Sequence, residues 1–500
     1  MSWKKTWFSH ILWALYSVIV CALLCRGIFT LISDTLGLHM IIGIICLFFV
    51  IWIGLWFLIQ KLISKRKRVA FIRTKRWVIV EWITVIAIIA AGVIGYGFLL
   101  SNIGLSEVEQ SRILQNSFIN VDAAVNRTAS CSEWVYICVL RMLFLFVGNN
   151  TEAALWLQFI LQIAAAFIIY RGMCKISNRI ISVATLVGLT GISFVLLPQT
   201  FVSPSWLSFF LFSIGFYCLT LVFNNVNKIK PDSRKKIIFY GLGMFILGLY
   251  ISILSYIDIY NIVLILPGIS LLWSSKGNTI NEHPNGKNRI IQVICLIAGG
   301  IMGFFIILLI EAACYKISIT QTVSNWWSAY SVEINLNIYN NFSNSVCTLF
   351  VLLCAILFFA VPGFWKEKKK SLFDGFYFIW IGTITFYILG IGFWEYEIIY
   401  VLTVMMICSI YCVGKCFMPK EVMIKNDVDV HKELNNALQE SENVGPTEED
   451  KSVIKFLENP LPGPKKHVPK KLDYDLQNDE LNNMLMDYDI DIKDEDDFDL

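Results

Sequence analysis

The chain has 500 residues, of which 56% are hydrophobic and 16% are charged, and its net charge is +3. Apolar runs of eighteen or more residues recur along it, and such a run is typical of a helix that spans a lipid bilayer. These values exclude a soluble globular protein. They predict an all-α polytopic membrane protein, because a helix satisfies its own backbone hydrogen bonds in lipid. The sequence has no phosphate-binding glycine loop, and we expect no nucleic-acid partner.

The first 76 residues predict a two-helix hairpin followed by a basic loop. Apolar spans cover residues 7–32 and 38–63, and the loop from Lys61 to Arg76 carries eight Lys or Arg. The first span is too long for the apolar core of a signal peptide, so we expect the chain to retain it. Because loops rich in Lys and Arg stay on the cytoplasmic side, the N-terminus and this loop are predicted to be cytoplasmic.

Residues 77–414 predict the membrane core. A third span, 77–100, leads to a polar outer loop at 101–151, and a second outer loop is expected at 315–345. The cytoplasmic loops of this arrangement hold 23 Lys or Arg between them, whereas the outer loops hold four. The remaining predicted spans are 153–170, 180–198, 206–224, 237–257, 260–274, 290–313, 346–364, 375–394 and 397–414, which makes about 12 transmembrane helices in all.

The apolar run from Trp134 to Val147 is shorter than these spans. As a helix its fourteen residues extend about 21 Å, whereas the hydrocarbon core is about 30 Å thick. If the run crossed the membrane, the basic clusters Lys228–Lys236 and Lys366–Lys370 would face outward, against the positive-inside rule. We therefore predict an interfacial helix within the first outer loop.

Charged side chains of both signs gather in this first outer loop. The candidate general bases toward a hydroxyl group are its carboxylates, Glu107, Glu109 and Asp122. The candidate ligands of a phosphate are its guanidinium groups, Arg112, Arg127 and Arg141. Arg141 is notable because it interrupts the apolar run, and a cation there either extends to the lipid headgroups or binds an anion.

Three further residues are candidates for substrate binding. Asp258 lies in a tight turn between two predicted spans, and Trp326 and Trp327 lie in the second outer loop. Aromatic residues near the ends of membrane spans are commonly interfacial anchors. Contact with a sugar or a lipid is the alternative for the two tryptophans, and both interpretations stay open.

Cysteine and histidine give no sign of a metal centre. Most of the fourteen cysteines lie inside apolar runs, where cysteine behaves as a small hydrophobic residue, and the five histidines are scattered. Cys131 and Cys138 both lie in the outer region, so a disulfide between them is an open alternative that geometry has to decide.

Residues 415–500 differ in composition from the rest of the chain. They contain 11 Lys and 22 Asp or Glu, and they have no long apolar run. We predict an acidic, disordered cytoplasmic tail. A proline-rich segment at 456–468 and an acidic segment with apolar residues at 481–500 make region 456–500 a candidate to bind a cytoplasmic partner, and simple solubilisation is the alternative.

The order of these features resembles a known class of membrane enzyme. An outer loop that opens with an acid is followed by a helix with Tyr136, by Phe146-Val147-Gly148-Asn149-Asn150, and by a span that ends in Tyr170-Arg171. This order is similar to the GT-C class of integral-membrane glycosyltransferases. The most similar are family-39-like enzymes, which include protein mannosyltransferases and lipid A aminoarabinose transferases. The resemblance covers residues 77–179, is one of hydropathy alone from there to about residue 273, and is not evident beyond.

The resemblance implies a GT-C-like core and transfer of a sugar from a polyprenyl-phosphate donor to a cell-envelope acceptor at the outer membrane face. Glu107 would be the base, with Glu109 second, and Arg112 and Arg141 would bind the donor phosphate. Tyr136 would be a further substrate-binding residue, and a divalent metal could assist. This chain has Ser106-Glu107-Val108-Glu109 where the family has Asp-Glu-x-x-Tyr. The alternative is a non-catalytic relative that acts as a transporter of lipid-linked sugar or as a scaffold.

Overall fold

The structure is a computed structural model. It describes residues 3–32, 38–65, 71–73, 75–102, 108, 111–119, 131–196, 202–226, 234–268, 286–328, 344–367, 381–385, 394–417 and 421–423. The chain divides into two units, Met1–Met423 and Ile424–Leu500. The second unit lies outside the described residues. The predictions that the tail is disordered and that it binds a partner therefore concern residues that the structure does not describe.

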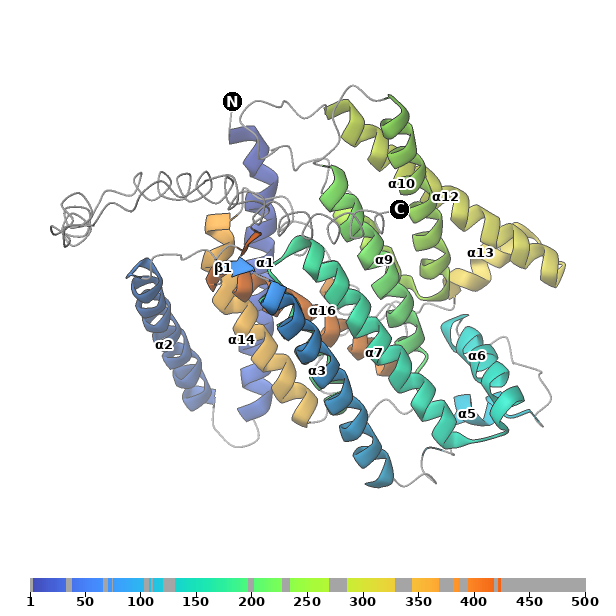
Figure 1. The fold of residues 1–500 in the computed structure, drawn as a ribbon, viewed down its shortest axis with the longest axis horizontal. Helices are drawn as coiled ribbons and strands as arrows, with labels where there is room; N and C mark the ends of the chain where they lie inside the picture. Colours follow the sequence, from blue (N-terminus) through green and yellow to red (C-terminus); the bar gives the residue numbers. More distant parts are fainter. Residues whose placement is uncertain are drawn as a thin grey trace, which may run out of the picture. The chain divides into compact units, whose positions relative to one another are not determined.

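The described part of the chain is helical, as predicted (Figure 1). Its helices are α1 (Trp3–Ile32), α2 (Leu38–Lys65), α3 (Lys75–Asn102), α5 (Arg112–Ser117), α6 (Cys131–Val147), α7 (Thr151–Ile176), α8 (Arg179–Leu196), α9 (Ser205–Val226), α10 (Arg234–Ile257), the 3-10 helix η2 (Ile259–Leu264), α12 (Gly286–Tyr315), α13 (Ile319–Ser328), α14 (Asn344–Glu367) and α16 (Trp394–Phe417). A small addition is the parallel pairing of β1 (Phe71–Arg73) with β2 (Glu421–Met423).

Six of the described helices are long and apolar enough to cross a membrane. Their apolar segments are Trp13–Ile32, Trp77–Asn102, Thr151–Ile176, Ser205–Val222, Ile238–Ile257 and Ile290–Ala313. Shorter apolar helices are Ile42–Leu55, Arg179–Phe194, Ile259–Gly268, Val346–Phe358 and Ile398–Tyr411. The predicted helical membrane protein is confirmed at this level. The total of twelve spans stays a prediction, because the span at 375–394 is described only at 381–385.

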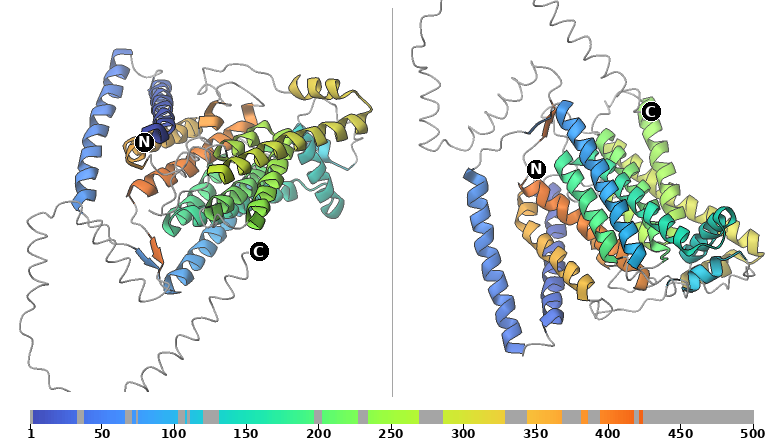
Figure 2. Two further views of the ribbon diagram at one scale, coloured as in Figure 1. Left: turned by 90° about the horizontal axis from the view of Figure 1, so that it is seen from above. Right: turned by 60° about the horizontal axis from the view of Figure 1, so that its bottom comes forward.

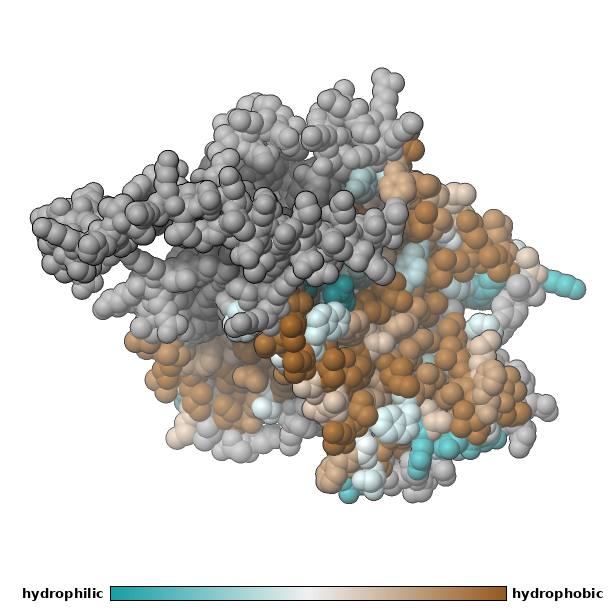
Figure 3. All heavy atoms as spheres, viewed as in Figure 1, coloured by the Kyte–Doolittle hydropathy of each residue, from teal (hydrophilic) through white to brown (hydrophobic). Residues whose placement is uncertain are grey.

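The outer surface of the described helices is apolar. Figure 3 shows brown, hydrophobic residues over most of the coloured surface, with hydrophilic residues mainly near its margins. Ile94 and Phe98 on α3, and Ile238 and Phe239 on α10, are among many large apolar side chains that are exposed. Soluble monomers rarely expose continuous apolar surface of this extent, so lipid is the environment that this exterior suits.

The main hydrophobic core joins the two ends of the described chain. Tyr16 on α1 is buried and donates a hydrogen bond of 2.7 Å to the carbonyl of Leu357 on α14. Trp13 Nε1 donates to the carbonyl of Val361 at 3.0 Å. Figure 2 shows α1 beside α14, in agreement with these contacts. A buried tyrosine and a partly buried tryptophan thus find backbone acceptors, which offsets the cost of removing their polar atoms from water.

Glycine allows α10 and α12 to approach closely. A Cβ atom on Gly248 of α10 would collide with the backbone carbonyl oxygen of Leu296, and a Cβ on Gly299 of α12 would collide with that of Phe245. The hydroxyl of Ser252 donates to the carbonyl of Gly300 across the same contact. Small residues at this interface let the two backbones touch, as is common between helices in lipid.

Replacement of Gly248 by Leu should therefore separate α10 from α12. The new side chain would meet backbone atoms, which cannot rotate away, so we expect a loss of at least about 2 kcal/mol in the free energy of unfolding. Gly243→Leu is a matched control on the same helix, because a Cβ there meets nothing within 4 Å. Thermal unfolding of the purified protein in detergent would measure both variants, and equal midpoints would contradict the close contact.

Candidate functional site

Helices α5 and α6 form a compact unit beside the N-terminal end of α7 (Figure 1). Helix α6 begins at Cys131, three residues before the predicted segment, and the chain leaves it through Gly148, whose φ is +78°. Asn150 then caps α7, because its side chain accepts a hydrogen bond from the backbone N–H of Glu152 at 2.9 Å. The side-chain oxygen of Asn149 accepts from the N–H of Ile119 at 3.1 Å, so the turn is tied to the segment that follows α5.

The first residue of α5 is paired with the first turn of α6. Arg112 Nη2 lies 2.8 Å from both carboxylate oxygens of Glu133. The side chain of Glu133 is only 3% exposed, whereas that of Arg112 is 67% exposed. A buried carboxylate needs a charge partner, so the arginine neutralises Glu133 while one side of its guanidinium group faces outward. Glu133 was predicted as part of the polar loop, and its pairing was not predicted.

Arg141 holds the other end of the same unit. Its Nε and Nη2 atoms donate to the backbone carbonyl of Asn116 at 3.1 and 2.8 Å. The sequence left headgroups or an anion open as partners for this cation, and the structure adds the last turn of α5 as an acceptor. Arg112 and Arg141 therefore fasten α5 to α6 at two points: Arg112 through the carboxylate of Glu133, and Arg141 through the backbone carbonyl of Asn116.

The interior of this unit is apolar and encloses one tyrosine. Val108, Ile113, Leu140 and Phe144 are buried in one cluster with Tyr136. The Tyr136 hydroxyl has no hydrogen-bond partner among the described residues. Burial raises the pKa of Tyr136, and Tyr96 raises it further, so this hydroxyl stays protonated and can act as a donor. Tyr136 is thus the predicted binding residue whose polar atom is enclosed in this unit.

The predicted acids themselves lie outside the described residues. This is true of Glu107, Glu109, Asp122 and also of Arg127. Val108, the residue between the first two acids, is described and is buried in the α5–α6 cluster. The peptide bonds of Val108 therefore connect the Glu-Val-Glu sequence directly to the core that contains Tyr136.

A second polar group surrounds Asp258, in the turn between α10 and η2. Asp258 caps η2 by accepting a hydrogen bond of 3.1 Å from the N–H of Tyr260. Burial raises the pKa of Asp258 to about 6, and the hydroxyls of Ser208 on α9 and Tyr400 on α16 oppose part of this rise. Asn261 donates to the carbonyls of Leu254 and Asp258 at 3.1 Å each. Four elements thus meet at one buried carboxyl group.

The two tryptophan candidates lie on α13. Trp327 is 62% exposed, and the side chain of Trp326 lies outside the described residues. Helix α13 contacts α12, and its Thr322 is buried. The exposure of Trp327 agrees more readily with a surface anchor than with the wall of an enclosed sugar pocket.

The open alternative of a disulfide between Cys131 and Cys138 is not realised. Cys138 is a free thiol in the structure, and burial raises its pKa although Arg141 lowers it. Among the described residues there is no group of three His, Cys, Asp or Glu side chains that could hold a metal ion.

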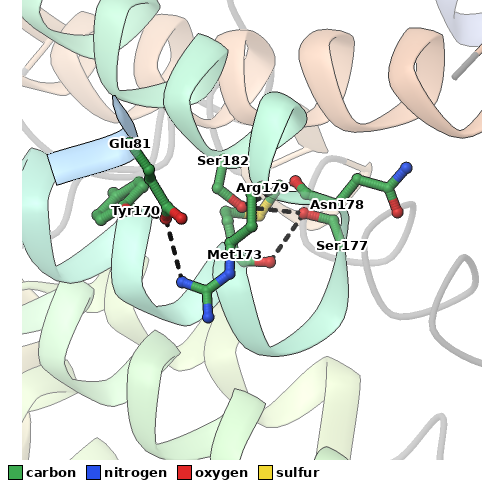
Figure 4. Close-up of polar contacts among 7 residues, drawn as sticks. All are labelled: Glu81, Tyr170, Met173, Ser177, Asn178, Arg179 and Ser182. Carbon is green, nitrogen blue, oxygen red and sulfur yellow. Dashed lines mark hydrogen bonds and ion pairs between the residues drawn. The ribbon is translucent and has the colours of Figure 1, made fainter. Parts of the chain in front are cut away.

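A third polar cluster joins α3, α7 and α8 (Figure 4). The Tyr170 hydroxyl donates to the carboxylate of Glu81, and Arg179 Nη1 lies 3.2 Å from the same carboxylate oxygen. Ser177 next to it donates to the carbonyl of Met173 at 2.8 Å. Opposite charges and hydrogen-bond donors satisfy each other here, so this cluster is best explained as a clamp that holds three helices together.

Sequence patterns could have indicated only one of the residues that the prediction missed. Glu133 precedes Trp134 by one position, and an acid is common in the first turn of a helix. Ser208 and Tyr400 carried no such signal, because each lies inside an apolar run and meets Asp258 only after the helices pack.

The buried Asp258 makes stability depend on pH. Its pKa is raised from 3.8 to about 6 on folding, so its contribution to stability is complete below pH 3.8 and is lost as the pH rises through about 6. Asp258→Asn keeps an oxygen that can cap η2 and removes the charge. We expect it to raise the free energy of unfolding by about 3 kcal/mol at pH 8 and by about half of that at pH 5.

Thermal unfolding in detergent at the two pH values would measure this difference. Asp258→Ala is the control, since it removes both the charge and the oxygen that accepts from Tyr260. A variant Asp258→Asn that is less stable than the wild type at pH 8 would show that the charged carboxylate is stabilised by its surroundings.

In comparisons with protein-family models, with curated proteins and with solved structures, nothing matches this chain.

Proposed function

We propose that the chain is an integral-membrane glycosyltransferase of the GT-C type that moves a sugar from a polyprenyl-phosphate donor to a cell-envelope acceptor at the outer membrane face. Three features support the proposal. Residues 77–179 resemble that class in the order of their motifs. The described chain is a bundle of apolar helices, which suits a lipid-linked donor. A folded helical unit, α5 with α6, lies beside the N-terminal end of α7.

The observation that carries the proposal is the burial of Val108 in the core of the α5–α6 unit. This residue connects Glu107 and Glu109 to a unit whose helices are fastened by Arg112 and Arg141. A general base has to be held in place relative to its substrate, and loops carried on rigid elements achieve this. The Glu-Val-Glu sequence is thus joined through Val108 to this folded unit.

The chemistry follows from these residue types. Glu107 accepts the proton of an acceptor hydroxyl, whose oxygen forms a bond to the anomeric carbon of the sugar. The bond from that carbon to the donor phosphate breaks, and its electron pair leaves with the polyprenyl phosphate. The outward side of the Arg112 guanidinium group, which is mostly exposed, can contact the phosphate and favour its negative charge. Glu109 is the second choice for the base.

Removal of the base should abolish transfer. Glu107→Gln keeps the size of the side chain and removes its basicity, so we expect the transfer rate to fall about a hundredfold or more. Membranes with wild-type or variant protein would be given a labelled polyprenyl-phosphate sugar. Glu152→Gln is the matched control, because Glu152 is an exposed acid in the first turn of α7.

Equal transfer by the wild type and Glu107→Gln would contradict the assignment of the base. If wild-type membranes bind the labelled donor and do not transfer its sugar, the alternative of a transporter or scaffold is favoured over the enzyme.

The proposal also requires that α6 lies in the interface and that both termini are cytoplasmic. The pairing of β1 with β2 supports this, because hydrogen-bonded strands lie on one side of a membrane. The chain between β1 and β2 must therefore cross the membrane an even number of times. The predicted spans from α3 to α16 number ten when α6 is left out and eleven when it is counted. A crossing α6 would thus separate the two strands.

Epitopes inserted into the full-length chain would test this orientation. The cells would first be treated so that antibody reaches the outer face of this membrane while the membrane itself stays sealed. We expect an epitope between Ala124 and Val125 to bind antibody under these conditions, and one between Ile229 and Lys230 to bind only after the membrane is permeabilised. Binding at the second position before permeabilisation would mean that α6 crosses the membrane.

A further inference from the structure

Helix α13 has an apolar side that its sequence spacing defines. Ile319, Val323 and Trp327 follow one another at intervals of four residues, so they lie on one side of the helix. Four of its polar residues fall on the opposite side, Gln321, Ser324, Asn325 and Ser328, and Thr320 lies at the border next to Trp327. No residue of the helix is charged. This arrangement is that of an amphipathic helix with a neutral polar side.

The apolar side of α13 faces away from the protein. Ile319 is 44% exposed, Val323 is 40% exposed, and Thr322, which lies beside them on the helix, is completely buried. Because α13 contacts α12, we place Thr322 at that contact and the apolar side next to it. Burying threonine while leaving isoleucine, valine and tryptophan exposed would cost free energy in water. The exposed side therefore requires an apolar environment.

The position of α13 along the chain indicates which environment this is. The apolar segment of α12 ends at Ala313, and α13 begins six residues later. Lys316, with φ of +52°, lies in the turn between them. The side chains of Ile301, Phe305 and Leu309 on α12 are more than half exposed, so α12 also presents an apolar surface outward. The apolar side of α13 thus comes next along the chain after the surface of α12, which suits lipid.

We propose that α13 binds the lipid–water boundary of the membrane, with Ile319, Val323 and Trp327 inserted among the headgroups and upper acyl chains. Helix α13 then lies along the membrane surface, as amphipathic helices with tryptophan on the apolar side commonly do. Lys316 is exposed in the preceding turn, where its ammonium group can contact lipid phosphate. The proposal goes beyond the glycosyltransferase function and is independent of it, since it assigns Trp327 to lipid.

A lipid surface fits this side better than a second protein does. The apolar side continues from α12 without an intervening charged residue other than Lys316, and basic residues are suited to headgroups. Helix α6 has a similar exposed apolar end, at Leu145 and Phe146, next to the start of the α7 span. Helix α13, which follows the α12 span, and helix α6, which precedes the α7 span, would then both lie at a membrane boundary.

Site-specific photocrosslinking to lipid would test the proposal. The full-length protein would carry p-benzoylphenylalanine at Val323 or Trp327 on the apolar side, or at Gln321 or Ser324 on the polar side, one position at a time. Each variant would be reconstituted into vesicles of phosphatidylethanolamine and phosphatidylglycerol with a trace of alkyne-tagged phospholipid. The same residue at Ile301, on the exposed surface of α12, is the positive control.

We expect lipid labelling at positions 323 and 327 to approach that at 301 and to exceed that at 321 and 324 by about fivefold or more. Equal labelling of both sides, or labelling at 301 alone, would overturn the proposal. Crosslinking of positions 323 and 327 into a dimer would overturn it as well, since a second copy would then cover the apolar side. Transfer activity of Glu107→Gln has no bearing on these outcomes, so the two proposals fail separately.

Discussion

Charged and strongly polar side chains in this apolar chain have to find partners within the protein, and the geometry of the outer unit depends on that requirement. Arg112 pairs with Glu133, whose carboxylate is almost completely buried, and Arg141 donates to the carbonyl of Asn116. An unpaired charge in a low-dielectric environment costs several kcal/mol, so these contacts are strongly favoured once the helices meet. They hold α5 against α6, and Val108, which stands between Glu107 and Glu109 in the sequence, is buried in the cluster that these helices form.

The same requirement explains the difference between the other two polar clusters. Glu81 has both a cation and a phenol as partners, so its cluster is internally satisfied and acts as a clamp between helices. Asp258 receives one backbone N–H and lies near two hydroxyls, and a cation is not among the groups that shift its pKa. The result is a carboxyl group whose pKa is raised to about 6, so it takes up a proton at mildly acidic pH, where an ordinary aspartate stays ionised. Such groups are more common at functional sites than in structural clamps.

Close contact between helices and an apolar outer surface are two further features of the fold. Gly248 and Gly299 let α10 and α12 touch at their backbones, which increases dispersion contacts where water cannot supply a hydrophobic driving force. The outward surfaces of α3, α10 and α12 are apolar, as is one side of α13. The fold thus presents apolar side chains on its outer surface as well as in its core, whereas the polar contacts described above lie between helices.

The sequence by itself determined the helical class, the positions of most helices and the existence of a short helix near 134–147. These depend on local properties, since the length and hydropathy of a run are read from adjacent residues. Only the tertiary structure decided that Glu133 is the partner of Arg112, that Ser208 and Tyr400 approach Asp258, and that Cys138 is free. Arg112 and Glu133 are 21 residues apart, and Tyr170 and Glu81 are 89 apart. Contacts over such distances arise when helices pack, and no local pattern in the chain encodes which residues will then face each other.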